Sequence, residues 1–127
     1  MPTVSRRDIV WVTFPEPEDI HPEEMDNPHP TVVLQADDMN NKLDSTIVIP
    51  ISTNAVRDSL REVPIPAHNE DVEEDSKAVL TQITTVSVPG RIFDEGEEEE
   101  AWKMGELSAD KMGEIEDRLG YLFGVGY

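Results

Sequence analysis

The stretch DNPHPTVVLQADD, residues 26–38, holds one titratable ring, His29, between Pro28 and Pro30. A histidine has an unperturbed pKa of about 6.5, so it can accept and donate a proton near neutral pH. The two prolines bias the backbone toward extended geometry and restrain the ring. His29 is therefore a candidate for acid–base chemistry, and the alternative is a residue that only caps a loop.

Several other chemistries lack the residues that they need. The chain has no cysteine, which excludes disulfides, thiol catalysis and thiolate metal sites. Its histidines, His21, His29 and His68, lie near acids but show no HxxxH, HxH or EF-hand spacing, and no glycine-rich phosphate loop occurs. A Ser–His–Asp triad can be written in almost any acidic chain, so it carries no weight. We expect neither a metal nor a cofactor.

The charge of the chain is strongly negative and unevenly distributed. Its 28 acids and ten bases give a formal net charge of −18. The segments 16–26, 70–75 and 94–100 hold six, five and six acids and no base, which is 17 of the 28. Such segments are typical of solvated loops, here in a salt-adapted organism, and the alternative is that they recruit a basic partner or repel nucleic acid.

Short runs of β-branched and aromatic residues predict the strands that must position His29. Strands at 8–14 and 31–35 flank a loop at 15–30 that holds five of the ten prolines. Loops of that length in a small domain are usually functional or disordered. Further strands are expected at 45–51, 62–66, 78–88 and 102–104, with one or two helical turns at 54–60. Pro50 has no N–H, so it predicts a sheet edge or a bulge near the end of its strand.

The C-terminal part predicts one helix. Ser108 suits the N-cap and Asp110 the first turn, where the helix dipole favours an acid. Apolar residues then recur at helical spacing, namely Met112, Ile115, Leu119 and Leu122. A glycine, Gly120 or Gly124, is expected to end the helix.

Four to six short strands followed by one helix favour a mainly β fold, a small antiparallel barrel closed by the helix. The length of 127 residues fits one domain, 1–127, with a core of its own. No run approaches the roughly 20 apolar residues that cross a bilayer, and the first residues lack the apolar segment of a signal peptide. We therefore expect a cytoplasmic protein that does not enter the membrane.

The order of these elements resembles that of the MazF/PemK toxins. The likeness runs from about residue 7 to 124 through the blocks RRDIVWVTF, HPTVVLQADDMN, STIVIPIST, DSKAVLTQITTV and GELSADKMGEIEDRLG. Each block alone is only a strand or helix pattern, but their joint order and spacing is specific.

The resemblance implies an SH3-like barrel that forms a homodimer, with an RNA groove along the dimer interface. It also implies a metal-independent endoribonuclease of a type II toxin–antitoxin system, which cuts single-stranded RNA by attack of a ribose 2′-OH on the adjacent phosphorus. A cognate antitoxin, whose tail occupies the same groove, is the expected protein partner.

The family's catalytic arginine precedes the proline that opens the second strand, and this chain has His29 there. Arginine clamps phosphate but does not titrate near neutral pH, whereas histidine exchanges a proton. The family's catalytic serine or threonine ends the third strand, where IPIST places Ser52. Its hydroxyl would hydrogen-bond the phosphate, and the alternative is a strand-end hydroxyl bonded to the backbone. The resemblance thus implies that His29 and Ser52 are catalytic.

A second arginine of the family often follows the QI of a later strand. Here that block reads QITT, so Thr84 stands where the arginine would be, two residues after Gln82. Arg91 is a nearby base that would compensate.

Aromatic side chains near the first loop offer stacking surfaces for RNA bases. Phe14 lies at the edge of that loop, whereas Trp11 is expected in the core. With Thr53, which follows Ser52, the predicted RNA-binding residues are Phe14, Thr53, Gln82, Thr84 and Arg91.

A catalytically inactive relative is the alternative function. Such a chain would keep the barrel and the dimer but act as a binding or regulatory module. The missing arginines and the acidic loop favour this alternative, whereas Ser52 and the rigid PHP sequence favour the enzyme.

Overall fold

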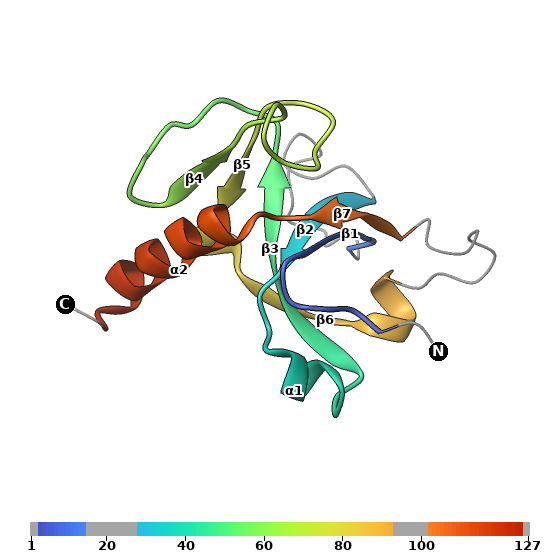
Figure 1. Cartoon of the computed structure of the whole chain (residues 1–127). Helices are drawn as coiled ribbons and strands as arrows, with labels where there is room; N and C mark the ends of the chain where they lie inside the picture. The colour runs from blue at the N-terminus through green and yellow to red at the C-terminus, as the bar shows by residue number, and fades with distance from the viewer. Residues whose placement is uncertain (1–2, 15–27, 93–101, 126–127) are drawn as a thin grey trace.

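The computed structural model describes residues 3–14, 28–92 and 102–125. In this part of the chain, two short turns, η1 (3₁₀) and η2 (π-helical), accompany the strands and helices (Figure 1). The elements are β1 (Asp8–Val12), β2 (His29–Val33), α1 (Asp37–Asn40), β3 (Ser45–Ser52), β4 (Glu62–Ile65), β5 (Ser76–Val79), η1 (Leu80–Gln82), β6 (Thr84–Ser87), η2 (Val88–Ile92), β7 (Lys103–Glu106) and α2 (Ala109–Phe123).

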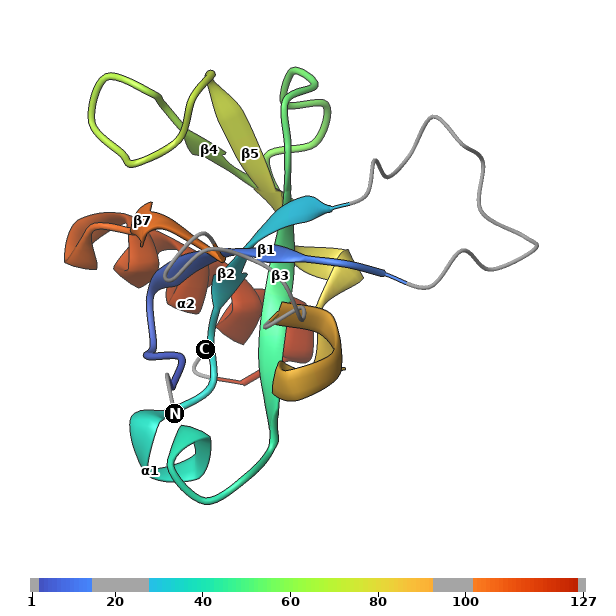
Figure 2. The ribbon, with the colours of Figure 1, turned by 90° about the vertical axis from the view of Figure 1, so that its right-hand side faces the viewer.

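The strands form one antiparallel sheet in the order β4-β5-β3-β2-β1-β7, and β6 also pairs with β3. The sheet curls into a half-barrel, with β3 running through its middle and α2 lying against it (Figures 1 and 2). The predicted fold class, mainly β with a C-terminal helix, is confirmed. Neither helix of the described part is long and apolar enough to cross a membrane.

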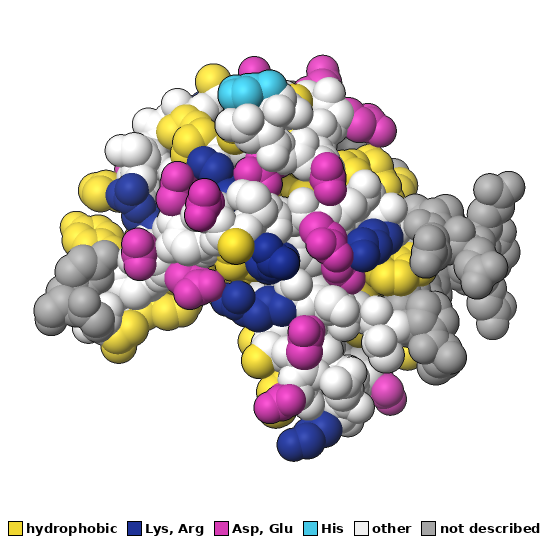
Figure 3. Space-filling model, in the orientation of Figure 1, with side chains coloured by type: hydrophobic (Ala, Val, Ile, Leu, Met, Phe, Trp, Pro, Cys, Tyr) yellow, Lys and Arg dark blue, Asp and Glu magenta, His cyan; other side chains and the backbone are white. Residues whose placement is uncertain are grey.

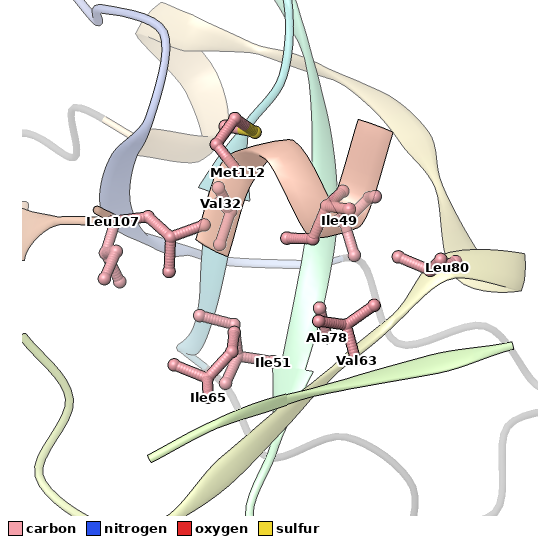
Figure 4. Packing of buried hydrophobic residues seen from close by; sticks show 11 residues of the cluster. Val32, Ile49, Ile51, Val63, Ile65, Ala78, Leu80, Leu107 and Met112 are labelled. Carbon is pink, nitrogen blue, oxygen red and sulfur yellow. The ribbon is translucent and has the colours of Figure 1, made fainter. Parts of the chain in front are cut away.

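Alternation along the strands divides the core into two layers. Ile49 of β3 and Val32 of β2 point to one face, whereas their neighbours Val48 and Val33 point to the other. The first layer receives Met112 and its neighbours from α2, as Figure 4 shows. Because side chains alternate with period two in a strand, a slip of one residue would exchange the two layers.

Pro50 does not lie at a sheet edge, because β3 is a central strand, so the first of its two predicted alternatives, an edge or a bulge, is wrong. The N–H of Leu34 donates to the carbonyl of Ile47 at 2.8 Å, so these two residues form a hydrogen-bonded pair. Hydrogen-bonded and non-hydrogen-bonded pairs alternate along an antiparallel ladder. The pair of Thr31 and Pro50 lies three positions further along the ladder and is therefore not hydrogen-bonded. The nitrogen of Pro50 therefore faces away from β2.

On that far side, β3 changes its partner at Pro50. Its residues 45–48 pair with β6, and its residues 51 and 52 pair with β5. No ladder bond is needed from the residue between the two partners, so a proline costs little there.

The strand predicted at 78–88 is also wrong, since the chain forms β5, the turn η1 and β6 instead. Leu80 starts the turn and buries its side chain in the first core layer. The turn lets the two halves pair with different parts of β3, which one straight strand cannot do. The helical turns expected at 54–60 are absent as well, because that segment is a loop with a turn at its end.

Helix α2 begins where the sequence predicts. Ser108 is its N-cap, with Oγ accepting from the N–H of Lys111 at 3.1 Å, and Gly124 ends it at φ 73°. The N–H and Oγ of Ser108 donate to Glu70, each at 2.7 Å. Asp71 accepts from the N–H of Glu106 at 3.0 Å. The acids of 70–75 are thus not all solvated, since two of them attach their loop to β7 and α2.

The other two acidic segments, 16–26 and 94–100, lie outside the described residues. They contain 12 of the 28 acids and none of the ten bases. On the face shown in Figure 3, acidic and basic side chains are interspersed rather than separated. Most of the excess negative charge of the chain therefore belongs to these two segments.

We predict that Gly105→Ala destabilises the protein. A Cβ on Gly105 would lie 2.4 Å from the Cβ of Asp71, which must move and strain its bond to Glu106. We expect a loss of about 1–3 kcal/mol in the free energy of unfolding, measured by urea titration with circular dichroism.

Gly113→Ala is the matched control, because a Cβ there meets nothing within 4 Å. Alanine is the better helix former, so this variant should gain about 0.5–1 kcal/mol. Equal stability of Gly105→Ala and wild type would show that the contact between β7 and the acidic loop is loose.

Candidate functional site

Two neighbouring strands bring His29 and Ser52 to the same end of the sheet. His29 is the first residue of β2 and Ser52 is the last of β3. The pairing of the two strands ends at Thr31 and Pro50, because Pro30 has no N–H with which to continue it. His29 and Ser52 lie two residues beyond this pair and line the same two pockets, so the two side chains lie near each other.

Two adjoining pockets open at this end of the sheet, and His29, Ser52 and Asn54 line both of them. The first, the Trp11 pocket, has a volume of about 350 Å³, and the second, the Arg57 pocket, about 450 Å³. A substrate placed over His29 and Ser52 would therefore have room on both sides.

The Trp11 pocket combines an aromatic wall with negative charge. Trp11 is half-buried and lines this pocket, so its expected place in the core is wrong. Thr53, which the sequence predicts to bind RNA, lines the pocket together with Glu73 and Glu74. A base can stack on Trp11, whereas the two carboxylates repel phosphate.

Phe14 lies beside the imidazole of His29. The two ring centroids are 6.4 Å apart at 65°, an edge-to-face arrangement. Such contacts hold two rings in a fixed relative orientation. The predicted stacking residue thus lies at the site and restrains its histidine.

The hydroxyl of Ser52 already makes one backbone contact. Its Oγ accepts from the N–H of Asn54 at 3.3 Å. This bond is the strand-end interaction considered as an alternative role for Ser52. It uses a lone pair of the oxygen and not the hydroxyl proton, so Ser52 can still donate to a phosphate oxygen.

The Arg57 pocket contains Gln82, which the sequence predicts to bind RNA, and a buried ion pair. Lys77 pairs across the sheet with Ser52, and its Nζ lies 2.5 Å from Oε2 of Glu62. Burial alone would raise the pKa of Glu62. The bonds from Lys77 and from the N–H groups of Arg57 and Asp58 outweigh burial and lower this pKa to about 2.

Thr84 and Arg91 line neither pocket. Thr84 pairs with Val48, four residues before Ser52 and so about 13 Å from it along β3. The carbonyl of Arg91 accepts from the N–H of Thr13, which places Arg91 at the end of β1 near Phe14. The structure thus gathers four of the seven predicted site residues into the pockets, namely His29, Ser52, Thr53 and Gln82, and puts Phe14 in contact with His29.

Five residues of the Arg57 pocket were missed from the sequence: Asn54, Arg57, Glu62, Lys77 and Val79. The sequence contains no clear signal for them. Lys77 stands between the acidic segment 70–75 and the apolar run 78–80, where a charged residue is ordinarily exposed to solvent.

The described residues contain no group of three histidine or carboxylate side chains arranged to hold a metal ion. His21 and two of the acidic segments lie outside them, so the expected absence of a metal stays a prediction.

The sequence of residues 5–123 matches the model of a protein family described as the PemK-like, MazF-like toxin of type II toxin–antitoxin systems. The chain belongs to this family. The match spans nearly all of the chain, including every described strand and the whole of α2. It confirms the resemblance that the separate sequence blocks indicated. No sequence among curated proteins matches it.

Solved structures of MazF proteins share the fold. MazF from Deinococcus radiodurans is 20% identical, with 98% of this chain and 100% of that chain covered and a TM-score of 0.73. The Mycobacterium tuberculosis toxin MazF-mt6 is 19% identical, with 95% and 100% covered and a TM-score of 0.69. An endoribonuclease in complex with its cognate antitoxin, from a mycobacterial species, is 12% identical, with 96% and 95% covered and a TM-score of 0.65.

The ion pair makes a prediction for this family member. The pKa of Glu62 is about 2 in the folded chain and 4.5 ordinarily, so folding favours the ionised carboxylate. This stabilisation is complete above the ordinary pKa and is lost as the pH falls toward about 2. Glu62→Gln should therefore cost about 3 kcal/mol of unfolding free energy at pH 6 and almost nothing near pH 2. Urea titrations over that pH range measure the difference.

Glu114→Gln is the control, because Glu114 is exposed where it pairs with Lys111. Exposed pairs contribute little, so this variant should differ from wild type by less than about 0.5 kcal/mol at every pH. If the cost of Glu62→Gln does not change with pH, the Lys77–Glu62 pair is not the source of the stability.

Proposed function

We propose that this chain is a metal-independent endoribonuclease, the toxin of its toxin–antitoxin pair, which cuts single-stranded RNA. The observation that carries the proposal is that the imidazole of His29 and the hydroxyl of Ser52, at the ends of two neighbouring strands, line the same two pockets. The family membership supports it, as does the structural likeness to a mycobacterial endoribonuclease.

The reaction needs only groups that the chain supplies. A neutral ring nitrogen of His29 takes the proton of the ribose 2′-OH, whose oxygen attacks the adjacent phosphorus. The P–O5′ bond breaks, and the imidazolium returns a proton to the departing 5′ oxygen. The products are a 2′,3′-cyclic phosphate and a 5′-hydroxyl, with no water consumed. Ser52 donates its hydroxyl proton to a phosphate oxygen, where charge develops in the transition state.

The remaining residues of the site would hold the RNA on either side of the cut. Phe14 and Trp11 offer ring surfaces for bases, and Thr53 and Gln82 offer hydrogen bonds. Thr84 and Arg91 lie outside both pockets, so they would contact nucleotides beyond the scissile phosphate.

The proposal extends to partners and location. A MazE–MazF complex from Deinococcus radiodurans and the mycobacterial complex contain antitoxins, so we propose a cognate antitoxin for this chain. We also propose a homodimer of single-domain barrels in the cytoplasm, where messenger RNA and the antitoxin are present.

A binding module without catalysis is the second candidate. Glu73 and Glu74 favour it, because they place two negative charges in the pocket where a phosphate must bind. The repulsion is long-range in dilute buffer and falls to local range in molar salt, where the Debye length is about 3 Å. Activity confined to high salt would therefore reconcile the acidic pocket with the enzyme.

Cleavage of a long unstructured RNA, mapped by primer extension in dilute buffer and in molar KCl, tests the proposal. His29→Ala and Ser52→Ala should each lose about a hundredfold or more in rate, because each removes a group used in the transition state. The controls are His68→Ala, at an exposed loop histidine, and Ser45→Ala, at the other end of β3. Both should stay within about twofold of wild type. Folded wild type that cuts no RNA in either salt would favour the binding module.

His29→Arg separates proton transfer from phosphate binding. Arginine binds phosphate but keeps its proton, so a base other than residue 29 would be needed. We expect wild type to show a rate that rises with pH as the imidazole of His29 loses its proton, and the variant to show a lower rate without that rise. Identical pH profiles for the two proteins would contradict the acid–base role of His29.

A further inference from the structure

A buried lysine lies beside the proposed catalytic pair. Lys77 pairs across the sheet with Ser52, and its side chain is only 6% exposed. Lysine is almost never buried unless its charge is paired, because removing an ammonium group from water is unfavourable. The partners of Lys77 therefore indicate what it does in this site.

The Lys77–Glu62 pair fastens the loop 53–61 to the sheet. Lys77 Nζ donates to the carbonyl of Ala55 at 3.0 Å. Oε1 of Glu62 accepts the N–H groups of Arg57 at 2.7 Å and of Asp58 at 3.0 Å. One side chain thus binds a loop carbonyl and the other binds two loop N–H groups. This segment forms no helix or strand that would pair these groups, so the ion pair fixes its conformation.

The loop 53–61, held by these hydrogen bonds, places a second cationic side chain, Arg57, at the pocket. Arg57 lines it together with His29 and Ser52. The charge of Lys77 is cancelled by Glu62. No carboxylate among the described residues forms an ion pair with the guanidinium of Arg57, whereas Arg61, four residues further on, pairs with Asp58 at 2.7 Å. The net positive charge of this pocket therefore comes from Arg57.

We propose that Arg57 binds the scissile phosphate, and that the buried Lys77–Glu62 pair is the positioning element that holds Arg57 in the pocket. This inference rests on the proposed function. His29 and Ser52 offer a proton carrier and one hydrogen bond, but the phosphate gains charge as the 2′ oxygen attacks. A guanidinium offers two parallel N–H donors to phosphate oxygens and keeps its charge at every working pH. It thus supplies the stabilisation that the other two residues lack.

The first test measures binding without chemistry. A fluorescent single-stranded RNA with 2′-O-methyl groups cannot be cut, because the attacking hydroxyl is blocked. Its affinity is measured by anisotropy from dilute buffer to molar KCl for wild type, Arg57→Gln and the control Arg61→Gln. Arg57→Gln should bind about tenfold more weakly in dilute buffer. Its plot of log affinity against log salt should be shallower by about 0.7, as for one lost phosphate contact on a single strand.

The outcomes separate the two proposals. Weaker binding in Arg57→Gln alone supports the Arg57 assignment. It does so even if wild type cuts no RNA with free 2′-hydroxyl groups and the enzyme proposal fails. Equal affinity of Arg57→Gln and Arg61→Gln overturns the assignment, even if wild type cuts RNA. Wild type that binds no RNA at any salt overturns it too. On cleavable RNA, Arg57→Lys should fall between wild type and Arg57→Gln, because it keeps the charge and loses the second donor.

The second test addresses positioning by Lys77 and Glu62. The double variant Lys77→Met/Glu62→Leu replaces the ion pair with apolar side chains and releases the loop. It should bind the blocked RNA as weakly as Arg57→Gln does, and adding Arg57→Gln to it should change affinity by less than about twofold. Full additivity of the two losses would overturn the positioning role.

Amide hydrogen exchange in the wild-type protein tests the same positioning role, and its result does not depend on whether a variant folds. The amides of Arg57 and Asp58 donate to Glu62, whereas the amide of Val56 makes no hydrogen bond within the described residues. The first two should exchange at least about tenfold more slowly than the third. Equal rates would show that the ion pair does not hold the loop.

Discussion

The pairing of β3 with three other strands is the constraint on which this structure depends. One edge of β3 is occupied by β2, and the other is shared between β6 and β5. The change of partner occurs at Pro50, whose missing N–H interrupts no ladder there. Residues beyond Pro50 can therefore face β5, which pairs Ser52 with Lys77, while Ser52 and His29 line the same two pockets. The same strand separates the two core layers through alternate residues such as Val48 and Ile49. The strand order, the two core layers and the site thus all depend on the pairing of β3.

Local patterns predicted the elements whose cause is local. The cap at Ser108, the stop at Gly124 and the period-two strands follow from neighbours in the sequence, and the structure contains them. The break at Leu80 escaped prediction, because only the competition between two strands for β3 explains it. His29 and Ser52 came from the likeness to a family, and they lie together because the neighbouring strands β2 and β3 begin and end there. Arg57 could not be predicted, because its place depends on an ion pair between strands.

Charge in this protein acts at two different ranges. Segments with 12 of the 28 acids lie outside the described residues, and their field is one that salt screens. The Lys77–Glu62 pair is buried, and salt screens such pairs far less. An acidic chain can therefore keep an ordered cationic pocket, because the contacts that build it do not depend on the net charge. Ionic strength then governs the approach of RNA, and the buried pair governs the geometry that the RNA meets.

The loop 66–75 divides its acids between two tasks. Glu70 and Asp71 attach it to α2 and β7, and Asp75 accepts the N–H of Ala67 at 2.9 Å within the loop itself. Glu73 and Glu74 are exposed and line the Trp11 pocket. The first group cannot change without loosening the fold, whereas the second group can. Selection can thus alter the charge at the rim of the pocket through two codons, and RNA affinity can evolve independently of stability in this protein.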